Sequence, residues 1–163
     1  MPRRSNLRDD PEWIDAVRRY FGELCFACGQ ENPIGLHLRD LEVDRGGVSG
    51  AFTPRPHYRG SSDTLHGGIA ATAIDEICVW AGIMSEGVLT VTGTLDLRYR
   101  APLRVDDRIT ATGRVESRSG RRLAITGILQ AGGRIAAEGR GIFLVTANID
   151  DLLTGTSNLP AHR

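Results

Sequence analysis

The sequence predicts an α+β fold in which one antiparallel β-sheet wraps around a single long helix. The first observation is the stretch from Ile69 to Met84, where Asp75 and Glu76 are the only ionisable side chains and nearly the whole circumference is apolar or small. A helix of this kind needs cover on almost every side. The second observation is strand-like alternation in two runs before this stretch and four runs after it, which supplies that cover.

Length and composition are those of one ordinary domain, with 163 residues, 40% hydrophobic and 25% charged. The 20 basic and 20 acidic residues cancel, so nothing attracts the whole molecule to nucleic acid or to an anionic membrane. The sequence has neither an uninterrupted apolar run of about 18 residues nor a secretory leader. We therefore expect a cytoplasmic protein with no membrane and no nucleic-acid partner.

The three cysteines are an odd number and predict no disulfide framework. Cys25 and Cys28 form a CxxC motif, but no second CxxC completes a four-thiolate zinc site. His37, His57 or His66 offer further ligands in principle. Without a second CxxC we expect no metal here, and because no strand pattern precedes the pair we expect no redox chemistry either.

Each segment before the central helix carries its own signal. Residues 1–10 are charged and aperiodic, which predicts a loose arm. Residues 11–24 have apolar side chains at helical spacing, which predicts a short amphipathic helix packed on the outside of the main body. Residues 25–36 are rich in turn formers and predict an ordered loop, and a glycine-containing hairpin joins strands expected at 36–44 and 47–54.

After the central helix, Glu86 and Gly87 end the helical pattern and strict alternation begins. The strands expected here form antiparallel hairpins and cover residues 90–100, 108–116, 121–130 and 134–146. The chain thus divides into an arm with a helix at 1–24, a domain of sheet and central helix at 25–147, and an aperiodic tail at 148–163 that we expect to be flexible.

The N-terminus of the central helix is suited to an oxygen that carries negative charge. Gly67 and Gly68 allow close approach to the backbone, and first-turn amides lack a partner within the helix and carry partial positive charge. Asp75 lies two turns further on, and a buried unpaired carboxylate is costly enough to suggest a function. Alternatively, the glycines only make a tight turn, and Asp75 pairs with an arginine.

Three segments of the sequence occur in a recognisable order and spacing. They are CFACGQENPIGL at residues 25–36, HGG at residues 66–68 with an acid nine residues after the histidine, and TGTLDLRYRAP at residues 92–102. With these segments, residues 25–146 resemble the hotdog-fold acyl-CoA thioesterases of the phenylacetic-acid-type branch. The resemblance implies the hotdog fold, in which an antiparallel sheet wraps around one long central helix.

The resemblance also implies hydrolysis of an acyl- or aryl-acyl-CoA thioester to the free acid and CoA, without a metal or cofactor. Asp75 matches the family's acid, which acts as general base on water or as nucleophile, and the Gly67 amide matches the group that polarises the carbonyl. In relatives the site lies between subunits. We therefore expect a homodimer or homotetramer in which Asp75 of one chain works opposite the HGG segment of the other.

Further site residues follow from the same resemblance. Thr92 matches a position where a hydroxyl places the water or the carboxylate in some relatives, although a strand threonine with ordinary cross-strand contacts explains it equally. His66 is expected to order its loop, with a role as catalytic base as the alternative. Glu76 is the fallback acid, because adjacent side chains on a helix point about 100° apart. Gly68 and Asn32 are candidates for substrate binding.

Basic side chains near the end of the long strand are candidates for holding the phosphates of CoA, since guanidinium groups suit phosphate. The favoured residues are Arg98, Arg100 and Arg104, with Arg118, Arg121 and Arg122 also available. Most exposed arginines are simply solvated, so the pattern does not single one out.

Two other functions remain open. A hydratase or dehydratase of the same fold uses an acid and a histidine on a loop before the central helix, and residues 31–37 faintly resemble that signature. However, Gly35 and Leu36 stand where the histidine is expected, and Asp75 would have no task. The second possibility is a hotdog protein that binds acyl-CoA without turning it over, which only a turnover measurement separates from an enzyme.

Overall fold

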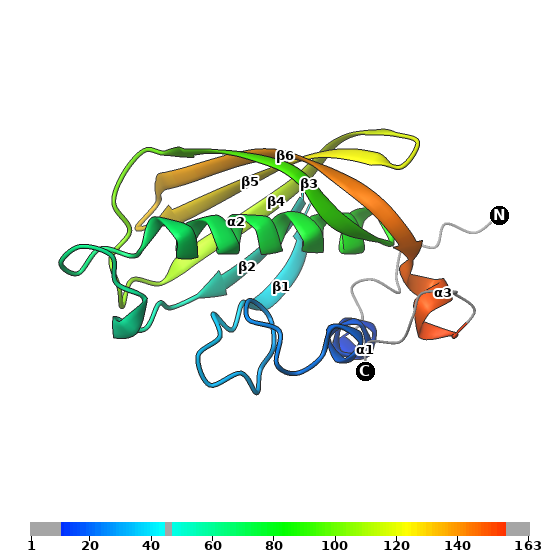
Figure 1. Ribbon diagram of the computed structural model, residues 1–163, viewed down its shortest axis with the longest axis horizontal. Coiled ribbons are helices and arrows are strands. Elements are labelled where there is room, and N and C mark those ends of the chain that lie inside the picture. The colour runs from blue at the N-terminus through cyan, green and yellow to red at the C-terminus, as the bar shows by residue number, and fades with distance from the viewer. Residues whose placement is uncertain (1–10, 45–46, 156–163) are drawn as a thin grey trace.

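The computed structural model describes residues 11–44 and 47–155. Its centre is a six-stranded sheet in the order β1-β2-β4-β5-β6-β3, and every neighbouring pair of strands is antiparallel. The sheet curves around the long helix α2, Gly67–Ala81 (Figure 1). The predicted hotdog architecture is confirmed.

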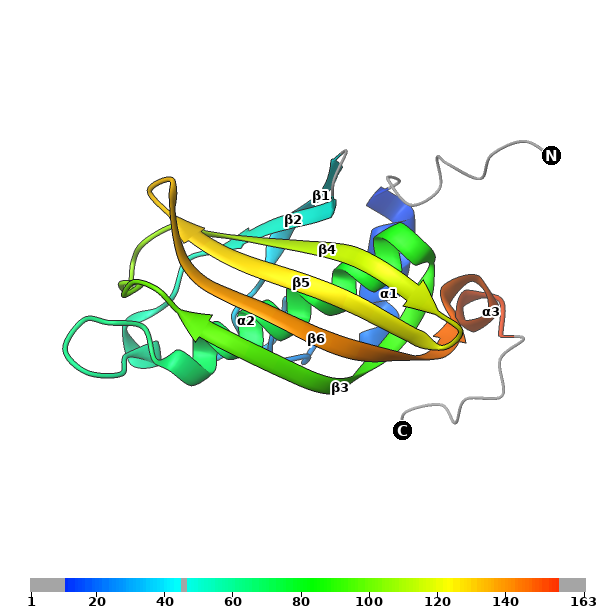
Figure 2. The ribbon, with the colours of Figure 1, turned by 90° about the horizontal axis from the view of Figure 1, so that it is seen from above.

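The sheet places two separate segments at its edges. The strands are β1 Arg39–Asp44, β2 Gly47–Phe52, β3 Val88–Tyr99, β4 Ile109–Ser119, β5 Arg122–Ala131 and β6 Arg134–Asn148. Strands β4, β5 and β6 follow one another as hairpins, whereas β3 leaves the end of the helical segment and lies beyond β6 (Figure 2). Strand β3 therefore has β6 on one side and, within the described chain, no strand on the other.

The alternation had predicted a strand that begins at residue 36, but strand β1 begins at Arg39. The backbone amide of Leu38 donates to the carbonyl of Ala27 at 2.9 Å, so this residue belongs to the preceding loop. His37 has φ 54°, a left-handed conformation that interrupts an extended strand. The loop's own hydrogen bonds therefore override the strand pattern.

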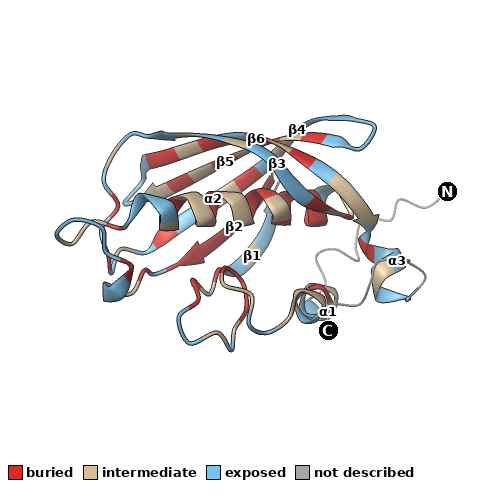
Figure 3. Ribbon diagram, viewed as in Figure 1, coloured by how far each residue is buried: buried red, intermediate tan, exposed pale blue. Residues whose placement is uncertain are grey.

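Helix α2 packs along the sheet, and its residues become more buried from its exposed first turn toward its far end (Figure 3). Ile74, Ile77 and Trp80 are all 0% exposed, as predicted from the apolar circumference. A π-helical turn, η2 Gly82–Glu86, continues the helix, and Gly87 ends it with φ 68° and a hydrogen bond from its amide to the Ile83 carbonyl. The predicted end of the helical segment is therefore correct.

Glycines in the strands let α2 approach the sheet closely. An ideal Cβ on Gly127 in β5 would lie 2.9 Å from both Cys78 Sγ and Ile74 Cγ2. A Cβ on Gly113 in β4 would collide with the backbone carbonyl oxygen of Ile77. Backbone cannot yield as a flexible side chain can, so the distance between the helix and the sheet depends on these two positions.

The continuous helical segment Gly67–Glu86 is long and apolar enough to cross a membrane by length and composition, with a mean hydropathy of 1.3 over its best window. Within the protein, 56% of that window is buried. The core helix of a sheet-wrapped domain has the same properties, so this resemblance to a membrane span is weak.

Helix α1, Pro11–Phe21, packs outside the sheet and contacts the far end of α2. Val17 is 0% exposed, and the rings of Phe21 and Trp80 lie 6.3 Å apart. The helix ends at Phe21 rather than at residue 24, because Gly22 adopts φ 87°. Residues 1–10, expected to form a loose arm, lie outside the described residues.

The segment expected to be a flexible tail is partly folded. Strand β6 extends to Asn148, and a short helix, α3 Ile149–Leu153, follows directly. Ile149 is 1% exposed, and its amide donates to the Gly87 carbonyl at 2.9 Å. One buried apolar side chain therefore fixes this turn although the segment has no periodicity. Residues 156–163 lie outside the described residues.

Replacing Gly113 with alanine should destabilise the domain by about 1–3 kcal/mol, the usual cost of overpacking a filled core. The matched control is Ser117→Ala on the same strand, where the side chain is exposed and the change should stay within about 0.5 kcal/mol. Urea unfolding of both variants measures the difference. A Gly113→Ala protein as stable as Ser117→Ala would contradict the close approach.

Candidate active site

His66 holds the N-terminus of α2 in place. Its ring Nδ1 accepts a hydrogen bond from the Gly68 amide at 3.0 Å, and its backbone amide donates to the carbonyl of Tyr58 in the short turn η1, Pro56–Tyr58. This is the N-cap arrangement that satisfies one of the free amides of a first helical turn. The expected loop-ordering role of His66 agrees with this geometry, and the Gly68 amide is already engaged.

The Gly67 amide differs from its neighbour. No hydrogen bond among the described residues uses this N–H group, while the Gly67 carbonyl accepts a bond of 2.9 Å from the Tyr99 hydroxyl. A pocket of about 420 Å³ opens beside it. The lining residues are Thr64, Leu65, Gly67, Ala70, Tyr99, Arg100, Ala101, Pro102, Leu103, Ala136 and Ala137. A free, exposed amide at a helix N-terminus can donate to a developing oxyanion.

Asp75 lies two turns along α2 and is only partly buried. Its Oδ1 accepts a hydrogen bond of 2.6 Å from the Thr92 hydroxyl on β3. Of the ion pairs found between described residues, none includes Asp75, so the alternative of an Asp75–arginine pair does not hold there. The bond to Thr92 fixes the carboxylate and leaves its second oxygen to take a proton.

Gly67 and Asp75 cannot serve one substrate within a single chain. Eight residues separate them on the same helix, and a rise of 1.5 Å per residue places them about 12 Å apart. An attacking oxygen and an oxyanion donor must both lie within about 3 Å of the reacting carbonyl. Within one chain, the Gly67 amide and the Asp75 carboxylate are therefore too far apart along α2 to act on the same carbonyl.

Glu76 points away from Asp75. Its Oε1 accepts a hydrogen bond of 2.8 Å from the indole N–H of Trp80, and its carboxylate lies close to the thiols of Cys25 and Cys28. Burial, and then the charge of Cys25, raise the pKa of Glu76 to about 7. The two neighbouring acids therefore occupy separate environments, and Thr92 contacts Asp75 rather than the fallback Glu76.

The cysteine pair beside Glu76 is a feature that sequence reasoning missed. The Cys28 thiol donates to the Cys25 sulfur at 3.3 Å, which lowers the pKa of Cys25 and raises that of Cys28. The CxxC motif was visible in the sequence, but Glu76 comes from α2, and only the fold brings it to the loop. No histidine joins the three groups among the described residues.

The arginines proposed for CoA phosphates lie in different surroundings. Arg100 pairs with Glu138 at 2.6 Å and lines the pocket beside Gly67. Arg104 pairs with Asp63. Arg98 lies on the outer face of the sheet. Two of the three guanidinium groups are thus already neutralised by acids, and phosphate binding by any of them remains a prediction.

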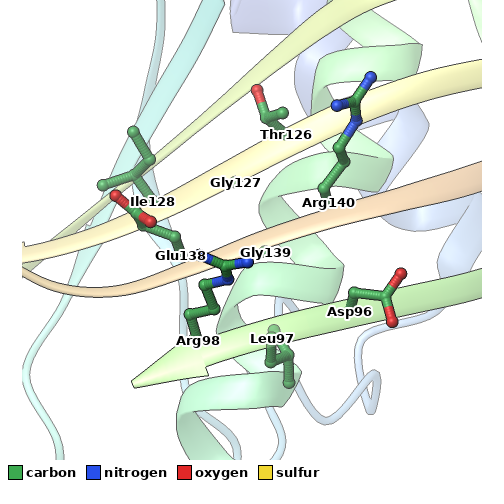
Figure 4. Close-up of a pocket in the computed structure, with 9 residues that line it drawn as sticks. All are labelled: Asp96, Leu97, Arg98, Thr126, Gly127, Ile128, Glu138, Gly139 and Arg140. Carbon is green, nitrogen blue, oxygen red and sulfur yellow. The ribbon is translucent and has the colours of Figure 1, made fainter. Parts of the chain in front are cut away.

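The outer face of the sheet carries a second pocket, of about 740 Å³ (Figure 4). Gly127 and Gly139 face Ile74 of α2, so the side chains that alternate with them project from the opposite face. The lining residues are Asp96, Leu97, Arg98, Thr126, Gly127, Ile128, Glu138, Gly139 and Arg140. This pocket and the Asp75 carboxylate are therefore on different sides of the sheet.

The loop that faintly resembles a hydratase signature is held by its own side chains. Asn32 donates to the Leu24 carbonyl at 2.9 Å and accepts from the Ile34 amide at 3.0 Å. Both ring nitrogens of His37 are also engaged, with the Asn32 carbonyl at 2.6 Å and with Arg55 at 3.2 Å. Asn32 and His37 therefore stabilise the loop through these hydrogen bonds. Substrate binding by Asn32 stays a prediction.

Comparison with known families agrees with this geometry. Residues 63–138 match the family model described as the thioesterase superfamily. This part of the chain is therefore similar to a thioesterase superfamily domain. The matched range includes Gly67 at the start of α2, Asp75 in the middle of this helix and Thr92 on the edge strand β3. No curated protein matches the chain.

Solved structures share the thioesterase fold. A thioesterase superfamily protein is 26% identical with a TM-score of 0.68 over 75% of this chain, which spans 60% of that protein's length. A hypothetical thioesterase from Streptococcus pneumoniae, solved with coenzyme A, is 20% identical with a TM-score of 0.62, covering 67% of this chain and 89% of its own. The PaaI protein of Escherichia coli, from the phenylacetic acid degradation operon, is 18% identical with a TM-score of 0.61, covering 67% and 80%.

Removing the N-cap of α2 should lower the stability of the domain, and another capping residue at the same position should restore it. His66→Ala is expected to lower the free energy of unfolding by about 1 kcal/mol, whereas His66→Asn should retain most of it because asparagine is a strong N-cap. Urea unfolding measures both values. An equal loss in the two variants would mean that the bond from Gly68 does not stabilise the helix.

Proposed function

We propose that this protein is an acyl-CoA thioesterase of the PaaI-like type, which hydrolyses an acyl- or aryl-acyl-CoA thioester to the free acid and CoA. The observation that carries the proposal is the Asp75 carboxylate, held by the Thr92 hydroxyl at 2.6 Å, on a helix that opens with the free Gly67 amide. The Streptococcus pneumoniae protein with coenzyme A and a Streptococcus mutans protein bound to acetyl CoA share the fold, which supports CoA thioesters as the substrate class.

In the proposed reaction, Asp75 acts on the carbonyl carbon of the thioester in one of two ways. As general base it takes a proton from water while the water oxygen forms the new C–O bond. As nucleophile it forms an acid anhydride, which water then hydrolyses. In both routes the carbonyl oxygen becomes an oxyanion that accepts a hydrogen bond from Gly67, and the C–S bond then breaks. In the first route the CoA sulfur takes the proton held by Asp75. In the second route CoA leaves as a thiolate and takes a proton from water. The chemistry needs no metal.

The proposed active unit is a pair of chains joined at β3. This strand is 12 residues long, lies at the edge of the sheet, and exposes 52% of Val91 and 57% of Tyr99. A long uncovered edge is a template for pairing with another chain. Thr92 and Tyr99 on this strand contact Asp75 and Gly67 respectively, so a second copy at this edge would meet both halves of the site.

Asp75→Asn should fold and bind CoA but lose turnover by about two or more orders of magnitude, as expected for a principal catalytic group. Thiol release from short, medium, long and aromatic acyl-CoA thioesters measures the rate, and thermal unfolding checks the fold. Asp15→Asn on α1 is the control, since this exposed acid lies away from the site. Equal rates for wild type and Asp75→Asn would remove Asp75 from the reaction. No release from any thioester by the wild type would favour an acyl-CoA-binding protein.

A charge placed on the β3 edge should separate the proposed pair. Val91→Lys is expected to shift the protein from dimer or tetramer to monomer and to lower turnover with it, because the two halves of the site part. Val43→Lys is the matched control on β1 at the opposite edge, where the side chain is 41% exposed. Sedimentation velocity gives the assembly state. A wild-type monomer with full turnover would contradict a site shared between chains.

A further inference from the structure

The side chains of Cys25, Cys28 and Glu76 converge at one point beside the far half of α2. Their sulfur and oxygen ligand atoms all lie within 4.8 Å of one another, and the two sulfurs are 3.3 Å apart. Cys28 is buried, and the other two residues are partly buried. The proposed thioester chemistry uses none of these groups. The sequence analysis considered only histidines as further ligands for the CxxC pair and expected no metal there.

The backbone around the two cysteines forms a tight turn that favours anionic sulfur. The Gly29 amide donates to the Cys25 carbonyl at 2.9 Å. The hydrogen bond from the Cys28 thiol, and then hydrogen bonds with the backbone of Cys28, Ala27 and Gly29, lower the pKa of Cys25. Successive amides that point at one atom create a local site for negative charge. A Cβ on Gly29 would lie 2.6 Å from the Cys25 carbonyl oxygen, so only glycine permits this turn.

Glu76 adds a carboxylate in a fixed orientation. Trp80, which is 0% exposed, donates its indole N–H to Oε1, and this bond leaves Oε2 for another partner. Of the ion pairs between described residues, none includes Glu76. The guanidinium of Arg18 lies over the Trp80 ring, 5.8 Å from its centroid, and is near Asp15. Three groups able to carry negative charge therefore meet without a cationic side chain bound to them.

We propose that Cys25, Cys28 and Glu76 bind one thiophilic divalent cation, Zn²⁺, with the fourth position left to water. Two thiolates and a carboxylate are ligands that zinc takes in proteins, whereas Mg²⁺ and Ca²⁺ prefer oxygen alone. The ion neutralises charge that is otherwise costly to bury. It also links the loop between α1 and β1 directly to the central helix.

This site is separate from the Asp75 chemistry and serves stability. Neighbouring residues on a helix point about 100° apart, and Glu76 faces the loop while Asp75 faces β3. The loop from Cys25 to Leu38 has no strand or helix of its own in the described chain and depends on turn hydrogen bonds. A bound ion therefore stabilises it, and removal of the ion should lower the melting temperature.

Metal analysis of the full chain tests this proposal. The protein is produced with a tag that lacks histidine and is purified with reductant and without chelator. Its metal content is then measured by inductively coupled plasma mass spectrometry. We expect about one zinc ion per chain in the wild type and strong depletion in Cys25→Ser, Cys28→Ser and Glu76→Gln. Cys78→Ala and Asp75→Asn are matched controls, because this cysteine and this acid lie outside the cluster, and both should keep the metal.

A second measurement does not depend on variants that fold. Wild-type protein stripped by chelator is titrated with Zn²⁺ against a coloured chelator, and with Co²⁺, whose thiolate absorption bands report sulfur ligands directly. Glu76→Gln should bind Zn²⁺ at least about tenfold more weakly, and the wild-type melting temperature should rise on adding Zn²⁺. Stripped wild-type protein that takes up no Zn²⁺ overturns the site. So does full metal content in Glu76→Gln or a Co²⁺ spectrum without thiolate bands.

Discussion

The close contact between the backbone of α2 and the sheet is the constraint on which the rest of the structure depends. Gly113 and Gly127 remove side chains where the helix would otherwise be held away, and Ile74 and Ile77 fill the space so formed. A helix packed this tightly cannot rotate or slide without losing contacts on several strands. Each polar group on it therefore has a fixed position, which is what a reacting group requires.

Because α2 is fixed against the sheet, its polar groups face different parts of the molecule. The exposed N-terminus carries the Gly67 amide, the middle presents Asp75 to the edge strand, and the following residue, Glu76, faces the loop that carries the cysteines. The same rigid element thus supports both the proposed site between chains and the cluster of Cys25, Cys28 and Glu76 within one chain. Because α2 is fixed, a ligand that orders the cysteine cluster need not move the groups around Asp75, and the reverse also holds.

The sequence predicted the features that depend on periodicity. The apolar circumference of α2 and the alternation of the four later strands have strong local signals, and the fold followed from their order. The loop and the last turn were harder, because β1 begins late through a hydrogen bond from Leu38 and α3 is fixed by the single buried side chain of Ile149. Contacts of these kinds depend on distant partners, and a local pattern does not contain them.

The candidate site divides in the same way. Asp75 and Gly67 were singled out by the family resemblance together with their places on one helix. The bond from Thr92 and the approach of Glu76 to the cysteines depend on which strand or loop lies beside which helical face. The arginines were least predictable. Their charges are long-range and their partners, such as Asp63 beside Arg104, come from segments far apart in the chain.

The two glycines at the start of α2 and the two adjacent acids within it also restrict how this gene can evolve. A single codon gained or lost between positions 67 and 75 would turn everything downstream by about 100°. The acid that now faces the edge strand would turn away from it. The apolar side chains of the helix would rotate as well and would no longer fit against the sheet. Lineages of this protein should therefore tolerate changes of residue along this helix far more readily than any change in its length.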